Sequence, residues 1–269
     1  MGFYLGSLFI AWYGVIIAAS ILLAFTVGFM LAKRHGYNTD VAFHLVLIVV
    51  PMAILGARVL YVITNPGLRF FAIRDGGLAI IGGLVFAIIS LLVYCRIRKV
   101  GFFTLCDFIV VGLILAQAVG RWGNFTSQEV YGWRVDSGFF PFVVNINGSM
   151  HLAIFFYDFV LNLIGFGVLY WFFTKKQTKW GTTSALYFIW YGTVRAILEP
   201  FRYPSYTLTF VSGNYMIFNR VSFVLSLLLI IYGCVILVAS KKGWLNQENK
   251  VLYKKEGVKD GGERNPEAV

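Results

Sequence analysis

Charged residues are scarce in this chain. Only 13% of its 269 residues are charged, whereas an ordinary soluble domain carries about 25%. Too few charged side chains are present to cover a soluble surface, and 59% of the residues are hydrophobic. The 23 basic residues outnumber the 12 acidic ones, but they form short clusters between apolar runs, as in membrane proteins, and not a patch that binds nucleic acid.

Cysteine and histidine are also rare, with three residues of each. Cys95, Cys106 and Cys234 lie inside apolar runs and show neither paired nor metal-ligand spacing. We interpret them as small core residues. No cluster of histidine, cysteine and carboxylate has ligand spacing either, so we expect no metal and no cofactor.

Long apolar stretches dominate what is present. Each has about 17 to 25 residues, the length that crosses about 30 Å of hydrocarbon. The sequence therefore predicts an all-α polytopic membrane protein with about seven transmembrane helices in one domain, residues 1–240, followed by a hydrophilic, disordered cytoplasmic tail, residues 241–269. The predicted helices are 8–32, 41–63, 78–95, 104–121, 153–173, 182–199 and 221–240.

The loops between these stretches predict one orientation. Four segments hold 15 of the 23 basic residues, including every lysine: 33–34, 96–99, 175–179 and the tail. The positive-inside rule places all four in the cytoplasm, so the N-terminus lies outside and the C-terminus inside. Residues 1–7 carry no basic side chain, so the first stretch is an uncleaved helix and not a signal peptide.

The other eight basic residues are all arginine and fall in the outer half of this topology. Three lie within or at the outer ends of predicted helices, where a charge costs several kcal/mol unless it is paired, hydrated or in a cavity. They suggest one shared polar cavity that grips phosphate or carboxylate, which the arginine fork does bidentately. These three are Arg58, Arg121 and Arg195; the others are Arg69, Arg74, Arg134, Arg202 and Arg220.

A structural explanation of these arginines remains open. In this alternative they extend to outer headgroups or pair with acids, and Glu199 stands one helical turn after Arg195. Glu129 and Asp158 are available to neutralise others. A transporter or receptor is a further alternative, but no lysine lies in any predicted helix and no acidic chain crosses the bilayer midplane.

A dense polar segment, Gly120–Gly132, directly follows the fourth apolar run. It supplies a cation, amides, hydroxyls and a carboxylate, and its glycines permit tight turns and close approach of a ligand. Tyr191 and Arg195 are spaced i and i+4, so they share one face of the sixth helix, which Pro200 ends. Tyr13 falls at the same predicted depth.

With these residues the chain resembles the prolipoprotein diacylglyceryl transferase family of the bacterial inner membrane. The segment from Gly120-Arg-Trp-Gly-Asn-Phe through Glu129 and Gly132 is similar to the family signature. The resemblance covers nearly the whole membrane domain. It includes Trp12-Tyr-Gly14, Gly56-Ala-Arg58 with Tyr61, Asp75-Gly-Gly77, Gly82-Gly83, Asp107-Phe108, Trp190-Tyr-Gly192, Arg195, Glu199 and Phe201-Arg202.

The resemblance implies transfer of the diacylglyceryl group of phosphatidylglycerol to the thiol of a lipobox cysteine in a prolipoprotein signal peptide, with release of glycerol-1-phosphate. It implies Arg195 at the departing phosphate and Arg121 in headgroup binding. Membrane lipids and these two substrates are the expected partners. By this resemblance the catalytic residues are Arg121, Arg195, Tyr191 and Glu129, and the lipid contacts are Arg121, Asn124, Tyr13, Arg58, Gly132 and Arg202.

The sequence departs from the family at the residue regarded as a candidate base. Ile81 stands where the family usually has histidine before the Gly-Gly pair of the third helix. Either the arginines ionise the thiol, or His151 substitutes as a base. Alternatively, the chain is a divergent paralogue that is non-catalytic or substrate-shifted and binds anionic lipid or lipoprotein precursors.

Overall fold

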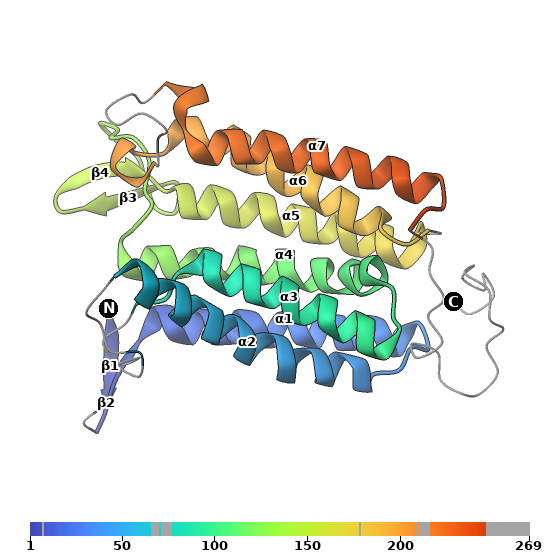
Figure 1. Ribbon diagram of the computed structural model, residues 1–269. Coiled ribbons are helices and arrows are strands. Elements are labelled where there is room, and N and C mark those ends of the chain that lie inside the picture. Colours follow the sequence, from blue (N-terminus) through green and yellow to red (C-terminus); the bar gives the residue numbers. More distant parts are fainter. Residues whose placement is uncertain are drawn as a thin grey trace. The chain divides into compact units, whose positions relative to one another are not determined.

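The computed structural model describes residues 1–6, 8–65, 70, 77–177, 179–207, 209 and 216–245. Predictions for Arg69, Arg74, Asp75 and residues 246–269 of the tail therefore lie outside the described residues. Within them the chain forms seven α-helices and two β-hairpins (Figure 1). The helices are α1 (Trp12–Arg34), α2 (Asp40–Thr64), α3 (Ile80–Arg98), α4 (Phe102–Ser127), α5 (Ile154–Lys175), α6 (Thr182–Leu198) and α7 (Val221–Lys241).

Six of these helices, all except α6, are long and apolar enough to cross a membrane. A polytopic membrane protein is therefore confirmed. The helix α6 has 17 residues and gives way to a 3₁₀ turn, Glu199–Phe201, at the position where Pro200 predicted its end.

Three parts of the prediction need correction. Residues 8–11, assigned to the first helix, form strand β2 (Leu8–Ala11), which pairs antiparallel with β1 (Gly2–Leu5). A second hairpin joins β3 (Val143–Ile146) to β4 (Ser149–Leu152), so the fold is not entirely helical. The fourth helix also continues through Ser127, so most of the polar segment predicted to follow it is helical.

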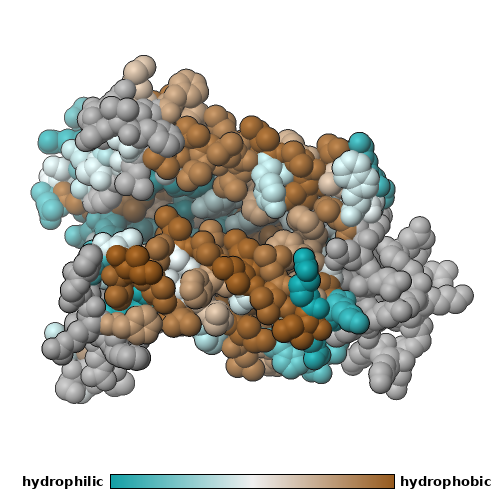
Figure 2. All heavy atoms as spheres, in the orientation of Figure 1, coloured by the Kyte–Doolittle hydropathy of each residue, from teal (hydrophilic) through white to brown (hydrophobic). Residues whose placement is uncertain are grey.

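The helices expose apolar side chains along their lengths, with hydrophilic residues gathered near their ends (Figure 2). On α7 the exposed residues recur every three or four positions, which places them on one face. A face of this kind, left uncovered by the rest of the described protein, is suited to lipid. Its members are Leu225, Leu228, Ile231, Val235 and Val238.

The chain divides into two compact units, described here separately. One comprises the described residues of Phe29–Leu105. In it, Gly56 on α2 faces Gly82 on α3, and a Cβ at Gly82 would lie 2.6 Å from Leu60 Cβ. Glycine at these positions therefore allows the two helix backbones to approach closely.

The other unit comprises Met1–Gly28 and Cys106–Leu245. In it α6 packs closely against α7, because a Cβ at Gly192 would lie 2.7 Å from Ser226 O, and one at Gly233 would lie 2.8 Å from Ala185 O. On α1 and α4, Gly123 accommodates the Tyr13 ring, whose Cδ2 would lie 2.9 Å from an added Cβ.

The beginning of α6 is held by a buried acid on α4. Asp107 Oδ1 accepts hydrogen bonds from Ser184 N at 2.8 Å and Ser184 Oγ at 2.6 Å. Its Oδ2 accepts from Gly181 N at 2.7 Å and also from Gln177 Nε2. Asp107 thus satisfies backbone donors that the first turn of a helix leaves unpaired, and it ties the N-terminus of α6 to α4.

Candidate functional site

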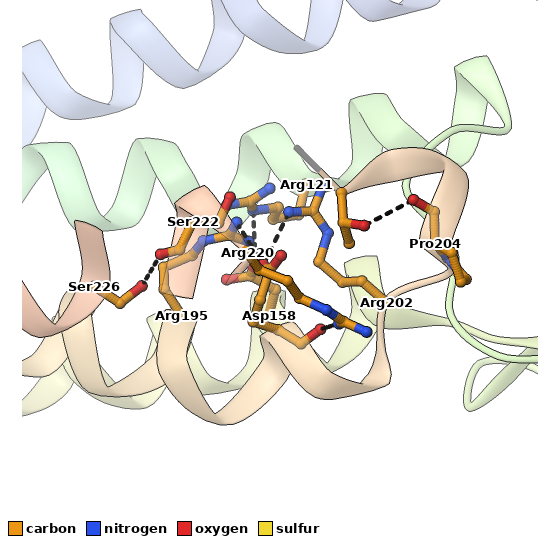
Figure 3. Close-up of polar contacts among 10 residues, drawn as sticks. Arg121, Asp158, Arg195, Arg202, Pro204, Arg220, Ser222 and Ser226 are labelled. Carbon is orange, nitrogen blue, oxygen red and sulfur yellow. Dashed lines mark hydrogen bonds and ion pairs between the residues drawn. The ribbon is translucent and has the colours of Figure 1, made fainter. Parts of the chain in front are cut away.

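Two buried carboxylates organise the other end of α6. Asp158, on the first turns of α5, is 1% exposed, and Glu199, directly after α6, is 0% exposed. A buried carboxylate is stable only when it is paired or hydrogen-bonded. Both acids meet arginines from several elements, and Figure 3 shows Asp158 among these arginines.

Asp158 lies between two arginines on different helices. Its Oδ2 is 2.9 Å from Arg121 Nε, on α4, and 4.0 Å from Arg195 Nη1, on α6. Its Oδ1 accepts a hydrogen bond of 2.5 Å from Asn162 Nδ2, one helical turn further along α5. Asn162 therefore fixes the carboxylate in the position where it meets both arginines.

Glu199 contacts three arginines. Its Oε2 lies 3.3 Å from Arg195 Nη2 and 3.1 Å from Arg202 Nη1. Its backbone carbonyl accepts a hydrogen bond of 2.5 Å from Arg220 Nη1, just before α7. We use the term arginine cluster for Arg121, Arg195, Arg202 and Arg220 together with Asp158 and Glu199.

The arginine cluster carries an excess of positive charge. Four guanidinium groups face two carboxylates, which leaves a formal charge of two positive units among these six described side chains. The Arg121 side chain is 21% exposed and makes its ion pair without an aligned hydrogen bond to any described residue. A partly accessible fork beside uncompensated positive charge can bind an anion such as phosphate.

The electrostatics of Arg202 agree with this crowding of cations. Burial lowers the pKa of Arg202 from its usual value, and the nearby charges of Arg195 and Arg121 lower it further, while Glu199 raises it. An anion bound among these groups would offset the repulsion.

Other predicted site residues lie on or beside α4 and α6. Tyr191, on α6, stacks on Tyr187 with ring centroids 5.8 Å apart. Asn124 is three residues after Arg121 on α4 and so lies on a neighbouring face. Tyr13 is exposed beside Gly123. Glu129 is exposed and forms no ion pair with another described residue.

Gly132 and His151 are buried together. Gly132 forms a backbone bridge to Arg202, and its carbonyl lies 2.9 Å from His151 Nδ1. Of the candidate lipid contacts named from the sequence, Gly132 thus reaches the arginine cluster through its backbone.

Two residues of the prediction belong to the unit that contains α2 and α3. Arg58 is buried and donates from Nε to Phe70 O at 2.8 Å and from Nη1 to Gly77 O at 3.0 Å. Ile81, on the first turn of α3, is 65% exposed. Arg58 therefore holds the chain that precedes α3.

Sequence reasoning named Asp158 and Glu199 only as neutralising partners, and it gave Arg220 no role. The signal for the acids was present, because an acid inside or at the end of an apolar helix is costly unless it has a specific partner. No comparable signal existed for Arg220, which donates to the backbone carbonyl of Glu199.

Comparison with known proteins gives one consistent result. The family model described as prolipoprotein diacylglyceryl transferase matches residues 1–239. A phosphatidylglycerol–prolipoprotein diacylglyceryl transferase of Listeria monocytogenes serotype 4b is 33% identical over 250 residues, which cover 87% of each chain. The protein of the same name from Streptococcus pyogenes serotype M5 is 34% identical over 249 residues, covering 88% of this chain and 93% of its own.

Proposed function

Because this chain belongs to the prolipoprotein diacylglyceryl transferase family, we propose that its arginine cluster is the site at which phosphatidylglycerol reacts. The protein transfers the diacylglyceryl group of phosphatidylglycerol to a prolipoprotein, the first step of lipoprotein maturation.

The observation that carries the proposal is the charge imbalance of the cluster. Asp158 and Glu199 hold four arginines in place but neutralise only half of their charge. The phosphodiester of phosphatidylglycerol carries one negative charge, and glycerol phosphate carries about two near neutral pH. The cluster therefore complements the leaving group better than the bound lipid, which is what lowers a reaction barrier.

The reaction needs no nucleophile from this chain. The sulfur of the substrate cysteine attacks the glycerol carbon that bears the phosphate ester, so a C–S bond forms as the C–O bond breaks. The oxygen keeps the electron pair and leaves as glycerol-1-phosphate, while the thiol proton passes to solvent or to a base. A free thiol has a pKa of about 8.5, so a positive field that favours thiolate assists the attack.

The arginines divide this work. Arg195, which lies within ion-pair distance of both carboxylates, is assigned to the departing phosphate. Arg121, partly exposed and without an aligned hydrogen bond in the described protein, is assigned to the headgroup. Arg202, Asn124 and Tyr13 are assigned to lipid contact around them, and Tyr191 and Glu129 to substrate contact and to orienting the arginines. The acceptor is the lipobox cysteine of a signal peptide.

The proposed topology has seven spans in the bacterial cytoplasmic membrane, with the N-terminus outside. The short helix α6 covers about 26 Å at about 1.5 Å per residue, and the 3₁₀ turn after it extends this length. The arginine cluster then faces the outer leaflet, where lipoprotein precursors emerge. Single cysteines at exposed Phe139 and Lys176 test this: an impermeant maleimide should label the first in intact cells and the second only after permeabilisation.

The alternative is a paralogue that binds anionic lipid or precursors without transfer. The exposed Ile81, in place of the family histidine, is the observation that favours it. In this case the cluster would still bind phosphatidylglycerol, but no covalent product would form.

Transfer in vitro distinguishes the two. The purified protein is incubated with phosphatidylglycerol and a lipobox peptide, and the peptide mass and released glycerol phosphate are measured. A diacylglyceryl mass gain on cysteine, absent from a peptide with serine in its place, supports the enzyme. Absence of transfer by a folded protein, with a family enzyme active in parallel, would favour the paralogue.

A further inference from the structure

The imidazole of His151 lies between two tyrosine rings. Its centroid is 4.5 Å from that of Tyr131 and 5.6 Å from that of Tyr203, and the residue is 7% exposed. Its Nδ1 lies 2.9 Å from Gly132 O. Since a carbonyl oxygen only accepts, Nδ1 carries a proton and donates it. One side chain thus joins β4 to the segment after α4 and the segment after α6.

Backbone hydrogen bonds connect the same three segments. On one side, Gly132 N donates to Leu152 O at 2.8 Å and Leu152 N donates to Trp133 O at 3.0 Å. On the other side, residues 131–133 are joined to residues 201–203 by two backbone bonds of 3.1 Å. Residues 131–133 therefore form a middle strand, and His151 fixes this strand through the carbonyl of its central glycine.

Arg202 is the central residue of the outer segment, 201–203. The chain there is no longer helical, so α6 does not hold it. This segment is held instead by the backbone bridge between Gly132 and Arg202 and by a hydrogen bond of 2.9 Å from Trp133 Nε1 to Pro200 O. From this position the Arg202 guanidinium reaches Glu199 at 3.1 Å.

We propose that His151 is a positioning residue of the transfer site, which acts through Gly132 to hold Arg202 against the phosphate of the lipid. This inference rests on the proposed function of the arginine cluster. In this role His151 does not replace the histidine base for which Ile81 stands in this chain. Its ring is enclosed by Tyr131 and Tyr203, and its protonated nitrogen, Nδ1, already donates a hydrogen bond to the backbone carbonyl of Gly132.

Two substitutions separate positioning from base catalysis. His151→Asn keeps an N–H donor near Gly132 O but cannot titrate, whereas His151→Phe keeps the ring packing and loses the donor. If His151 positions Arg202, His151→Asn keeps kcat/KM for phosphatidylglycerol within about threefold, and His151→Phe raises KM about tenfold with kcat little changed. The pH profile of both variants keeps the limbs of the wild type.

If His151 instead acts as a general base, the opposite results are expected. Both variants would then lose kcat by about 10²-fold or more, and the limb of the pH profile that reports the base would vanish. Equal loss in the two variants overturns the proposal. If His151→Phe does not fold, His151→Asn decides alone, because retained activity supports positioning and a loss of about 10²-fold with an altered pH profile overturns it.

The path through Arg202 is tested by a double-mutant cycle on phosphatidylglycerol binding. In an Arg202→Ala background, His151→Phe should weaken binding by less than about twofold, because the group that it positions is gone. The same tenfold loss in both backgrounds would overturn the proposal. Binding is measured without transfer, so the cycle remains decisive even if the wild-type protein transfers nothing, a result that would count against the proposed function alone.

Discussion

Glu199 Oε2 forms an ion pair of 3.3 Å with Nη2 of Arg195, the residue one helical turn before it. The same guanidinium reaches toward Asp158 through its other terminal nitrogen, at 4.0 Å. The two carboxylates thus lie at the two arms of the arginine fork, which favours one orientation of Arg195 before any ligand binds. Orientation in advance of reaction is what makes a charged donor effective at a developing anion.

Arg195→Lys tests whether this fork is needed. A lysine keeps the charge but cannot contact both carboxylates and a phosphate in fixed geometry. We expect Arg195→Ala to abolish transfer and Arg195→Lys to recover less than about a tenth of kcat/KM, since losing one oriented donor costs about 10²-fold or more. Arg134→Lys, at an exposed position, is the control and should keep wild-type activity. Full activity in Arg195→Lys would refute the fork argument.

Glu199→Gln tests the charge balance. The substitution leaves Arg195 and Arg202 without their shared carboxylate at a fully buried position, and breaking a buried pair costs about 3–5 kcal/mol. We therefore expect a lower Tm in detergent. The formal charge of the cluster also rises by one unit, so phosphatidylglycerol should raise the Tm of Glu199→Gln more than that of the wild type.

The control for this prediction is Glu129→Gln. Glu129 is exposed and has no ion pair within the described ranges, so its Tm should stay within about 1 °C of wild type, as for most surface substitutions. Equal stabilisation of Glu199→Gln and wild type by phosphatidylglycerol would show that the cluster is not where the lipid phosphate binds.

Length and hydropathy were enough to predict the seven helices to within a few residues, because these properties are what a bilayer selects. They failed at residues 8–11, which are as apolar as the helix they precede but pair with residues 2–5 instead. They also ended the fourth helix too early, because the polar segment after Arg121 has no apolar periodicity, yet it remains helical through Ser127.

The site was predictable where side chains meet side chains. Arg121 and Arg195 were found from their cost in an apolar helix, and the pairing with Glu199, offered as the structural alternative, is present as well. Contacts to backbone were not predictable: Arg220 meets a carbonyl of residue 199, and His151 meets a carbonyl of residue 132. Any residue can supply a backbone carbonyl, so no residue type in the sequence indicates such a contact.

Asp107→Asn tests how α6 is anchored at its other end. The amide would turn donor hydrogens toward the N–H groups of Gly181 and Ser184, leaving at least one buried donor unpaired at a cost of about 1–3 kcal/mol, with the loss of charge-assisted bonds in addition. We expect a clearly lower Tm, with kcat near wild type at low temperature where the fold persists. Ser184→Ala removes only one of the four bonds and should lower the Tm less. Equal Tm values for Asp107→Asn and wild type would contradict this anchoring role.

Gly132→Ala tests whether the backbone contact with residues 201–203 positions Arg202. A Cβ at Gly132 would lie 2.6 Å from Phe201 O and 2.8 Å from Leu152 Cβ, so the strands must separate. We expect Arg202 to move with them, which should raise KM for phosphatidylglycerol about tenfold, the size of effect expected from the loss of one charged contact. The measurement is the transfer rate against lipid concentration.

Gly167→Ala provides the matched control for this last change. Gly167 lies inside α5, and a Cβ there meets nothing within 4 Å. Alanine in a helix interior is favoured over glycine by about 1 kcal/mol, so Gly167→Ala should keep wild-type KM and unfold at the same or a higher temperature. If Gly132→Ala behaves like Gly167→Ala, close packing at residue 132 does not set the position of Arg202, and the cluster must hold that arginine through Glu199 alone.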